Sequence, residues 1–156
     1  MEYLTEFGYF GLFFASFLAA TILPLSSEAV LVFLLLNDFN PVVLLAVATF
    51  GNVLGSALNY ALGYGGSIVF MRKYSASVKN DIQTALARFK KYGTVSLLFA
   101  WLPVIGDPLT VAAGILKINI PLFLFLVTLG KLARYVVICF MVLSLVITLN
   151  FKVLFA

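Results

Sequence analysis

The chain has 156 residues, of which 63% are hydrophobic and 10% charged, and its formal net charge is +4. A soluble domain carries about 25% charged residues, and a globule this small cannot bury so much apolar surface. One cysteine and no histidine exclude an intrachain disulfide, histidine-containing zinc sites and Ser-His-Asp catalysis. We therefore expect an integral membrane protein without metal or cofactor, in which any chemistry depends on carboxylates, lysine or arginine.

Four apolar stretches follow one another along the chain. The second, at 42–70, and the fourth, at 122–151, are unbroken and exceed the roughly 20 residues that a bilayer requires. The first, at 7–36, and the third, at 92–116, are interrupted near their middle by residues that break helices or carry charge: Pro24 and Glu28, then Pro103, Gly106, Asp107 and Pro108. Their halves are short for spanning helices, which favours re-entrant hairpins.

The two broken stretches are related to each other. A shift of 79 residues aligns Pro24 with Pro103, Glu28 with Asp107, and Thr49-x-Gly51 with Thr128-x-Gly130. We interpret this register as an internal duplication; the alternative is that two unrelated loops acquired helix breakers independently. A hairpin plus one span crosses the membrane an odd number of times, so the second copy would be inverted, as in many transporters.

The predicted fold is therefore an all-α integral membrane protein, built as an inverted repeat of re-entrant helical hairpin plus transmembrane helix. We expect one membrane domain, 1–156, with repeat 1 at about 7–70, an amphipathic linker at 72–91 and repeat 2 at about 92–151. Six of the ten basic residues lie in the linker, which the positive-inside rule places in the cytoplasm. Both termini would then face the periplasm.

The linker has apolar residues at intervals of three or four, at Val78, Ile82, Ala85, Leu86 and Phe89. This spacing predicts an amphipathic helix lying on the anionic inner leaflet; a soluble connector helix is the alternative. Aromatic residues are not interleaved with these charges, so we expect no nucleic-acid partner.

Four charged residues fall within apolar stretches: Glu28, Asp107, Lys131 and Arg134. A charge at the bilayer centre costs about 2.5–3.5 kcal/mol on insertion scales, so each needs a reason. A carboxyl group in a low-dielectric cavity keeps its proton to a higher pH, which suits the two acids to proton or substrate handling. The two cations share a helix face and would clamp a phosphate. The alternative is that the four charges form two buried ion pairs.

Small residues recur every four positions in the second stretch, at Gly51, Gly55, Asn59 and Gly63. This spacing is typical of close helix packing in membranes. Asn52 is a further candidate for the site, because it takes the position of Lys131 in the other repeat.

Several motifs together resemble the small YqaA-type branch of the DedA superfamily, over about residues 7–140: Leu23-Pro24-x-x-Ser27-Glu28, Gly51-Asn52-x-x-Gly55, Trp101-x-Pro103-Val104-x-Gly106-Asp107 and Gly130-Lys131-x-x-Arg134-Tyr135. The resemblance implies a multi-pass protein of the bacterial inner membrane with two opposed re-entrant loops. It also implies a lipid translocase or scramblase, since members are linked to polyprenyl-phosphate recycling and to the proton-motive force.

One departure from this pattern affects the mechanism. Larger relatives carry arginines three residues before and three after the second proline, where this chain has Ala100 and Gly106. Our hypothesis is that Lys131 and Arg134 replace them. We expect a transporter-like protein, not an enzyme, that moves an anionic lipid or lipid-linked phosphate, with membrane lipids and protons as partners. The alternative is a non-catalytic structural subunit.

Overall fold

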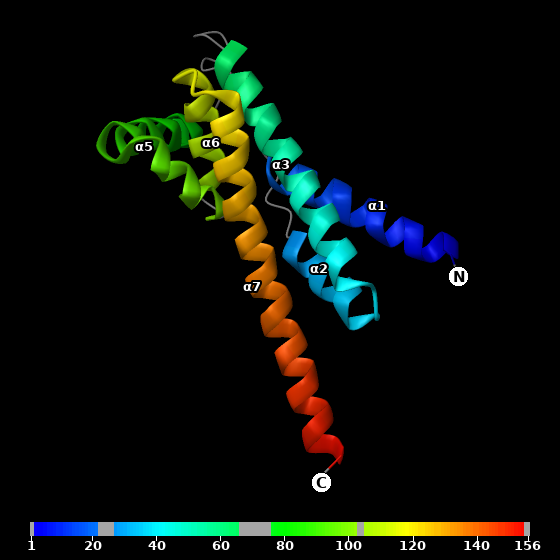
Figure 1. Ribbon diagram of the computed structural model, residues 1–156. Coiled ribbons are helices and arrows are strands. Elements are labelled where there is room, and N and C mark those ends of the chain that lie inside the picture. The colour runs from blue at the N-terminus through cyan, green and yellow to red at the C-terminus, as the bar shows by residue number, and fades with distance from the viewer. Residues whose placement is uncertain (1, 22–26, 66–75, 103–104, 155–156) are drawn as a thin grey trace.

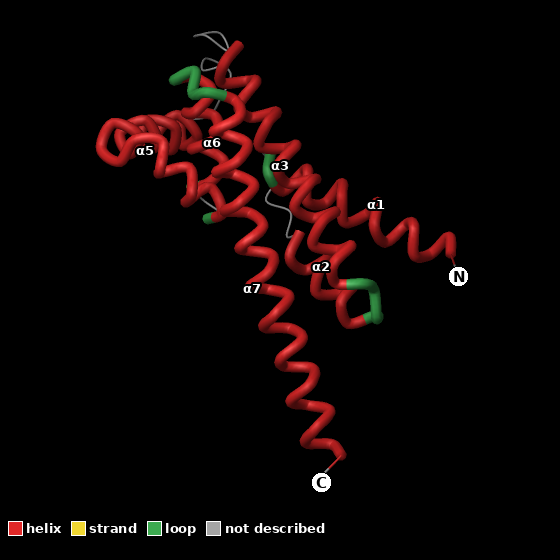
Figure 2. Tube along the Cα trace, in the orientation of Figure 1, coloured by secondary structure: helices red, strands yellow, loops and turns green. Residues whose placement is uncertain are grey.

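The computed structural model describes residues 2–21, 27–65, 76–102 and 105–154, and every regular element within these ranges is a helix (Figures 1 and 2). The all-helical prediction is thereby confirmed for the described part of the chain. In chain order the elements are α1 (Glu2–Ala19), α2 (Ser27–Leu36), α3 (Pro41–Gly65), α5 (Ala76–Tyr92), the 3-10 helix η1 (Gly93–Trp101), α6 (Gly106–Ile115) and α7 (Ile120–Leu154).

Two of these helices, α3 and α7, form the long axis of the molecule. In the described residues they are the two helices long and apolar enough to cross a membrane, at Pro41–Gly65 and Ile120–Thr148. They contact each other, and the end of α3 lies at the same end of the molecule as the start of α7 (Figure 1). They therefore run in opposite directions.

The two broken stretches are each divided into separate helices. The first becomes α1 and α2, and the third becomes η1 and α6. Pro24 and Pro103, which we expected at the breaks, lie outside the described residues. The 3-10 geometry of η1 was not predicted. It follows directly from α5 at Gly93, whose φ of +65° is a left-handed conformation that glycine adopts at no steric cost.

Gly106 and Pro108 lie directly after the interval that separates η1 from α6. Both lie in the first turn of α6, which begins at Gly106. The first turn has backbone N–H groups without intrahelical acceptors, so a proline there loses no hydrogen bond. These two residues therefore start α6.

The helix boundaries repeat along the chain with the offset seen in the sequence. α2 covers residues 27–36 and α6 covers 106–115, while α3 begins at residue 41 and α7 at residue 120. The turns also correspond: Phe39 N–H donates to Leu34 O at 3.2 Å, and Ile118 N–H donates to Ala113 O at 3.1 Å. Asp38 and Lys117, at φ 60° and 53°, both occupy the left-handed region.

Two hydrophobic clusters hold the helices together. One joins α1, α2, the first half of α3 and the middle of α7, around Leu12, Leu31 and Leu44. The other joins α5, η1 and α6 to the end of α3 and the start of α7, around Leu97, Leu109 and Phe123. Each long helix contributes to both clusters, so α3 and α7 connect α1 and α2 to α5, η1 and α6.

The amphipathic helix of the linker is present as α5, but its apolar face does not lie open for lipid. Ile82, Ala85 and Phe89 are 2–6% exposed, and α5 packs against α6 and η1. Periodicity shows that a helix has an apolar face, but it does not show what covers that face. Here protein covers it, which corrects the prediction of a helix lying on the leaflet through this face.

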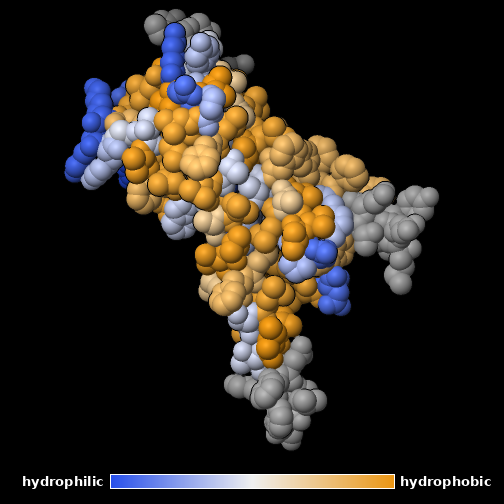
Figure 3. Space-filling view, viewed as in Figure 1, coloured by the Kyte–Doolittle hydropathy of each residue, from blue (hydrophilic) through white to orange (hydrophobic). Residues whose placement is uncertain are grey.

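The molecular surface follows the same division. Hydrophilic side chains gather over α5, at the turn before α7 and at the turn between α2 and α3, and hydrophobic side chains cover the face between them (Figure 3). Large apolar side chains are exposed along both long helices, among them Phe50, Leu58, Phe125, Val137 and Phe140. A bilayer is the environment in which such a belt is stable.

Candidate functional site

The four charged residues within the apolar stretches come together where the first turns of α2 and α6 meet α7. Glu28 lies in the first turn of α2 and Asp107 in the first turn of α6. A carboxylate is favourable in that position, because the N-terminal end of a helix carries a partial positive charge. Lys131 and Arg134 are three residues apart on α7 and share a face of it.

Arg134 contacts residues from both of the broken apolar stretches. Its Nη2 forms an ion pair with Oε1 of Glu28, and its Nη1 donates to the carbonyl oxygen of Trp101, at the end of η1, at 3.0 Å. The side chains of Arg134 and Glu28 are 21% and 26% exposed. One guanidinium group therefore links the start of α2 to the end of η1 and remains partly accessible.

Lys131 lies deeper, with 4% of its side chain exposed. Its Nζ donates to Oδ1 of Asn52 and lies 3.9 Å from Oδ1 of Asp107, whose side chain is 26% exposed. A buried ammonium group is tolerated only when it is paired and hydrogen-bonded, and here an amide and a carboxylate supply the partners. The structure thus brings together all five candidate site residues of the sequence, as two ion pairs plus Asn52.

The structure also adds Tyr135 and Ser27, which were not among the predicted site residues. The Tyr135 hydroxyl, on a side chain 1% exposed, accepts from Asn52 Nδ2 at 2.9 Å and shares a hydrogen bond with Ser27 Oγ at 3.0 Å. Tyr135 follows Lys131 by four residues, so the two lie on one face of α7. That spacing was the signal in the sequence that could have identified it.

The network formed by Lys131, Asn52, Tyr135 and Ser27 joins α7, α3 and α2. Asn52 occupies its centre, since its oxygen accepts from Lys131 while its nitrogen donates to Tyr135. Ser27 is adjacent to Glu28, so the network connects the neighbourhood of one ion pair to the other.

The glycines of α3 lie at close helix contacts. A Cβ atom at Gly51 or Gly55 would collide with backbone carbonyl oxygens of α1, and one at Gly63 would collide with the carbonyl of Val111 in α6. Asn59 donates to Ala20 O at 2.7 Å and to Thr110 Oγ1 at 3.3 Å. This face of α3 therefore sets the positions of α1 and of α6, the helix that carries Asp107.

Comparisons with known proteins identify the family. The sequence model of the VTT-domain family matches residues 22–144 of this chain. This range includes all the site residues above. The inner membrane protein YqaA of Escherichia coli K12 is 43% identical over 128 residues, covering 81% of this chain and 85% of YqaA. The chain belongs to the VTT-domain family, as a YqaA-type member of the DedA superfamily.

Two other relatives have lower sequence identity to this chain. A Haemophilus influenzae protein is 33% identical over 138 residues, covering 83% of this chain and 84% of its own length. A Lactococcus lactis protein named alkaline phosphatase-like is 28% identical over 145 residues, covering 85% of this chain and 68% of its own. No solved structure matches the chain significantly. The chain is thus a bacterial inner-membrane protein, like its YqaA relative.

Proposed function

We propose that this VTT-domain protein is transporter-like and translocates or scrambles an anionic lipid or lipid-linked phosphate, with Arg134 and Lys131 as the anion-binding groups. One observation carries the proposal: Arg134 reaches both hairpins, pairs with Glu28 and still exposes a fifth of its side chain. A guanidinium group can hold a phosphate by two parallel hydrogen bonds. A phosphate would take the place that Glu28 now occupies on Arg134.

Displacement of a carboxylate by phosphate would give Glu28 and Asp107 a role in transport. Protonation of Glu28 would remove the charge that competes with phosphate for Arg134, and release of the proton would expel the phosphate. Asp107 stands in the same relation to Lys131, at 3.9 Å. This arrangement would couple movement of the anion to protons.

The two cations also compensate for the missing arginines. A side chain at Gly106 would collide with the carbonyl of Ala100, so the backbones at these two positions are too close for an arginine at Gly106. Arg134 bonds to Trp101 O, next to Ala100. We propose that Lys131 and Arg134 of α7 supply the positive charge that larger relatives place beside the second proline.

We further propose that the fold is an inverted repeat with two re-entrant hairpins. The equal offset of the helix boundaries and turns supports it. The contact between Lys131 and Asn52 supports it independently, because they hold equivalent positions in the two halves. Two equivalent residues touch each other only near the axis that relates their repeats.

A structural or assembly role is the second candidate, and the pairing of each cation with an acid favours it. The test is reconstitution of the purified protein in liposomes with a fluorescent anionic lipid, reading movement between leaflets. We expect acceleration by the wild type and none by Glu28→Gln. A purely structural protein would accelerate nothing.

A variant in which the two charges of the Glu28–Arg134 ion pair are exchanged distinguishes a transport role from a structural one. In Glu28→Arg with Arg134→Glu the ion pair is restored in reverse, so abundance in the membrane should recover relative to either single change. The cation has moved to α2, however, and lipid movement should remain lost. Recovery of both abundance and lipid movement would show that the pair acts only as a structural link.

A further inference from the structure

We propose that the groove between the last turns of α3 and the first turns of α7 binds one anionic phospholipid. Its acyl chain would lie on the rings of Tyr60, Tyr64 and Phe123, which we call the aromatic floor, and its phosphate would lie at Lys117. The site shares no residue with the charged cluster at Arg134 and Lys131. It does not depend on the proposed transport, because a lipid bound here need not be moved.

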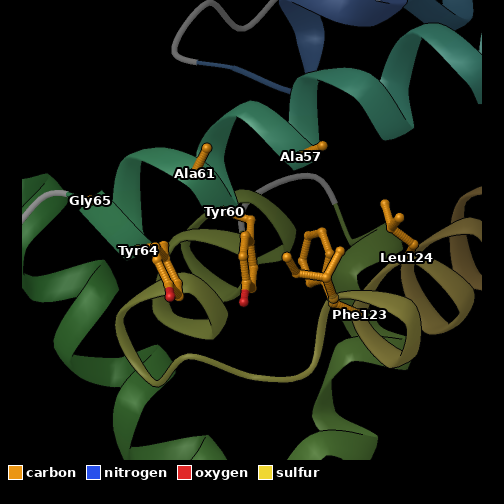
Figure 4. A pocket seen from close by; sticks show the side chains of 8 residues that line it. Ala57, Tyr60, Ala61, Tyr64, Gly65, Phe123 and Leu124 are labelled. Carbon is orange, nitrogen blue, oxygen red and sulfur yellow. The ribbon is translucent and has the colours of Figure 1, made fainter.

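The groove is a cavity of about 340 Å³ lined almost entirely by apolar atoms, a size typical of small-ligand sites. Its walls include Tyr60, Ala61 and Tyr64 of α3 and Ile120, Phe123 and Leu124 of α7. The rings of Tyr60 and Tyr64 project from α3 in the same direction, and Phe123 lies beside Tyr60 (Figure 4). The ring centroid of Tyr64 lies 6.1 Å from that of Tyr60, and the ring centroid of Phe123 lies 4.6 Å from it.

The aromatic floor is held in place from two sides. The Tyr60 hydroxyl donates to the carbonyl of Ile118 in the turn before α7, and the side chain is 6% exposed. Behind it, Gly114 of α6 lies so close to the Tyr60 carbonyl that a Cβ atom could not fit. The groove is therefore formed before any ligand enters, which lowers the entropy cost of binding.

The position of the groove identifies its occupant as lipid. Both walls belong to helices that are long and apolar enough to span the membrane, and aromatic residues at helix ends are typical of the membrane–water interface. The end of α3 leads into the basic linker, which the positive-inside rule assigns to the cytoplasm. Lipids of the inner leaflet are thus the molecules in contact with this groove.

The charge of the rim selects an anionic headgroup. Nζ of Lys117 lies 5.5 Å from the ring centroid of Tyr64, so the cation stands at the edge of the apolar groove. A phospholipid presents the matching order of groups, with an apolar chain next to a phosphate. A single lysine near a membrane surface contributes about fivefold to binding of an anionic lipid.

Native mass spectrometry of the full-length protein in detergent tests the site, with an equal mixture of phosphatidylglycerol and phosphatidylcholine as the probe. We expect the wild type to retain one phosphatidylglycerol preferentially. Lys117→Gln should lower that preference about fivefold. Lys91→Gln is the matched control, because Lys91 also lies over a tyrosine ring, Tyr92 at 5.1 Å, but outside the groove.

A second variant tests the apolar part. Ala61→Trp would fill the groove and should abolish retention of both lipids, whereas Ala46→Trp, at another exposed alanine of α3, should not. The proposal is overturned if Ala61→Trp retains lipid like the wild type, or if Lys91→Gln lowers the preference as much as Lys117→Gln. It is also overturned if glycerophosphoglycerol, which has no acyl chains, competes as well as the whole lipid, since the site would then recognise the headgroup alone.

Discussion

Lys131 of α7 donates a hydrogen bond to the side-chain oxygen of Asn52 of α3, 79 residues earlier in the chain. The same offset separates the starts of α2 and α6 and the starts of α3 and α7. The two long helices are therefore joined, in a buried region, by residues from equivalent positions. We therefore expect that replacing Asn52 destabilises both halves of the protein.

We expect Asn52→Leu to destabilise the protein, because the ammonium group of Lys131, 4% exposed, loses its amide acceptor. Leaving a buried polar group without its partner costs about 1–3 kcal/mol. The measurement is the thermal unfolding midpoint in detergent, with the exposed Asn80 of α5 changed to leucine as the control.

The double variant Asn52→Leu with Lys131→Met should recover part of that loss, because no buried ammonium group is then left without its amide acceptor, and Asp107, which loses Lys131 as its ion-pair partner, is 26% exposed and keeps contact with solvent. A double variant less stable than Asn52→Leu alone would contradict this explanation.

Tyr135→Phe removes one hydroxyl that bonds to both Asn52 and Ser27. Side-chain hydrogen bonds within membranes contribute about 0.6 kcal/mol on average and at most about 1.7, so we expect a modest loss of stability. A double-mutant cycle with Ser27→Ala measures the coupling. Strictly additive effects of the two changes would show that the Tyr135–Ser27 bond contributes nothing.

The sequence was enough to select four charged residues that the structure brings together, but not their hydrogen-bond partners. A proline, an acid and a small-residue motif in one register were enough to expect related halves and to select Glu28, Asp107, Lys131 and Arg134. A charged residue within an apolar stretch is easy to identify in the sequence, because such residues are costly in a membrane and therefore rare. The sequence could not show that Arg134 bonds to Trp101 O, because a backbone carbonyl carries no signature in the sequence.

The same limit explains the other differences. The face of α5 was visible in its periodicity, but its burial against α6 and η1 depends on tertiary packing. Tyr135 was overlooked because a tyrosine in an apolar helix has no net charge to draw attention. The sequence also did not show whether Pro108 stops one helix or starts the next, because a proline does either according to its position.

Gly→Ala substitutions on two helices should have opposite signs. At Gly55 a Cβ atom would lie 2.7 Å from that of Ala20 and would also meet the Phe17 carbonyl, so Gly55→Ala should separate α3 from α1 and lower the unfolding midpoint. At Gly11 the space is open, and alanine should stabilise α1 by about 0.5–1 kcal/mol through helix propensity. Equal effects at the two positions would contradict the packing role of Gly55.

The side of the membrane on which the two termini lie decides whether the hairpins are re-entrant. With two crossings, at α3 and α7, each terminus is separated by one crossing from the basic linker between them, so both termini face the periplasm. With four crossings, both termini share the cytoplasmic side of the linker. The start of α1 and the end of α7 lie away from the end of the molecule that carries α5 (Figure 1), as the first arrangement requires. We expect a carboxyl-terminal alkaline phosphatase fusion to be active and a green fluorescent protein fusion to be dark, with the reverse result for fusions placed after residue 75. A fluorescent carboxyl terminus would eliminate the re-entrant hairpins, and with them the inverted repeat on which the transport proposal depends.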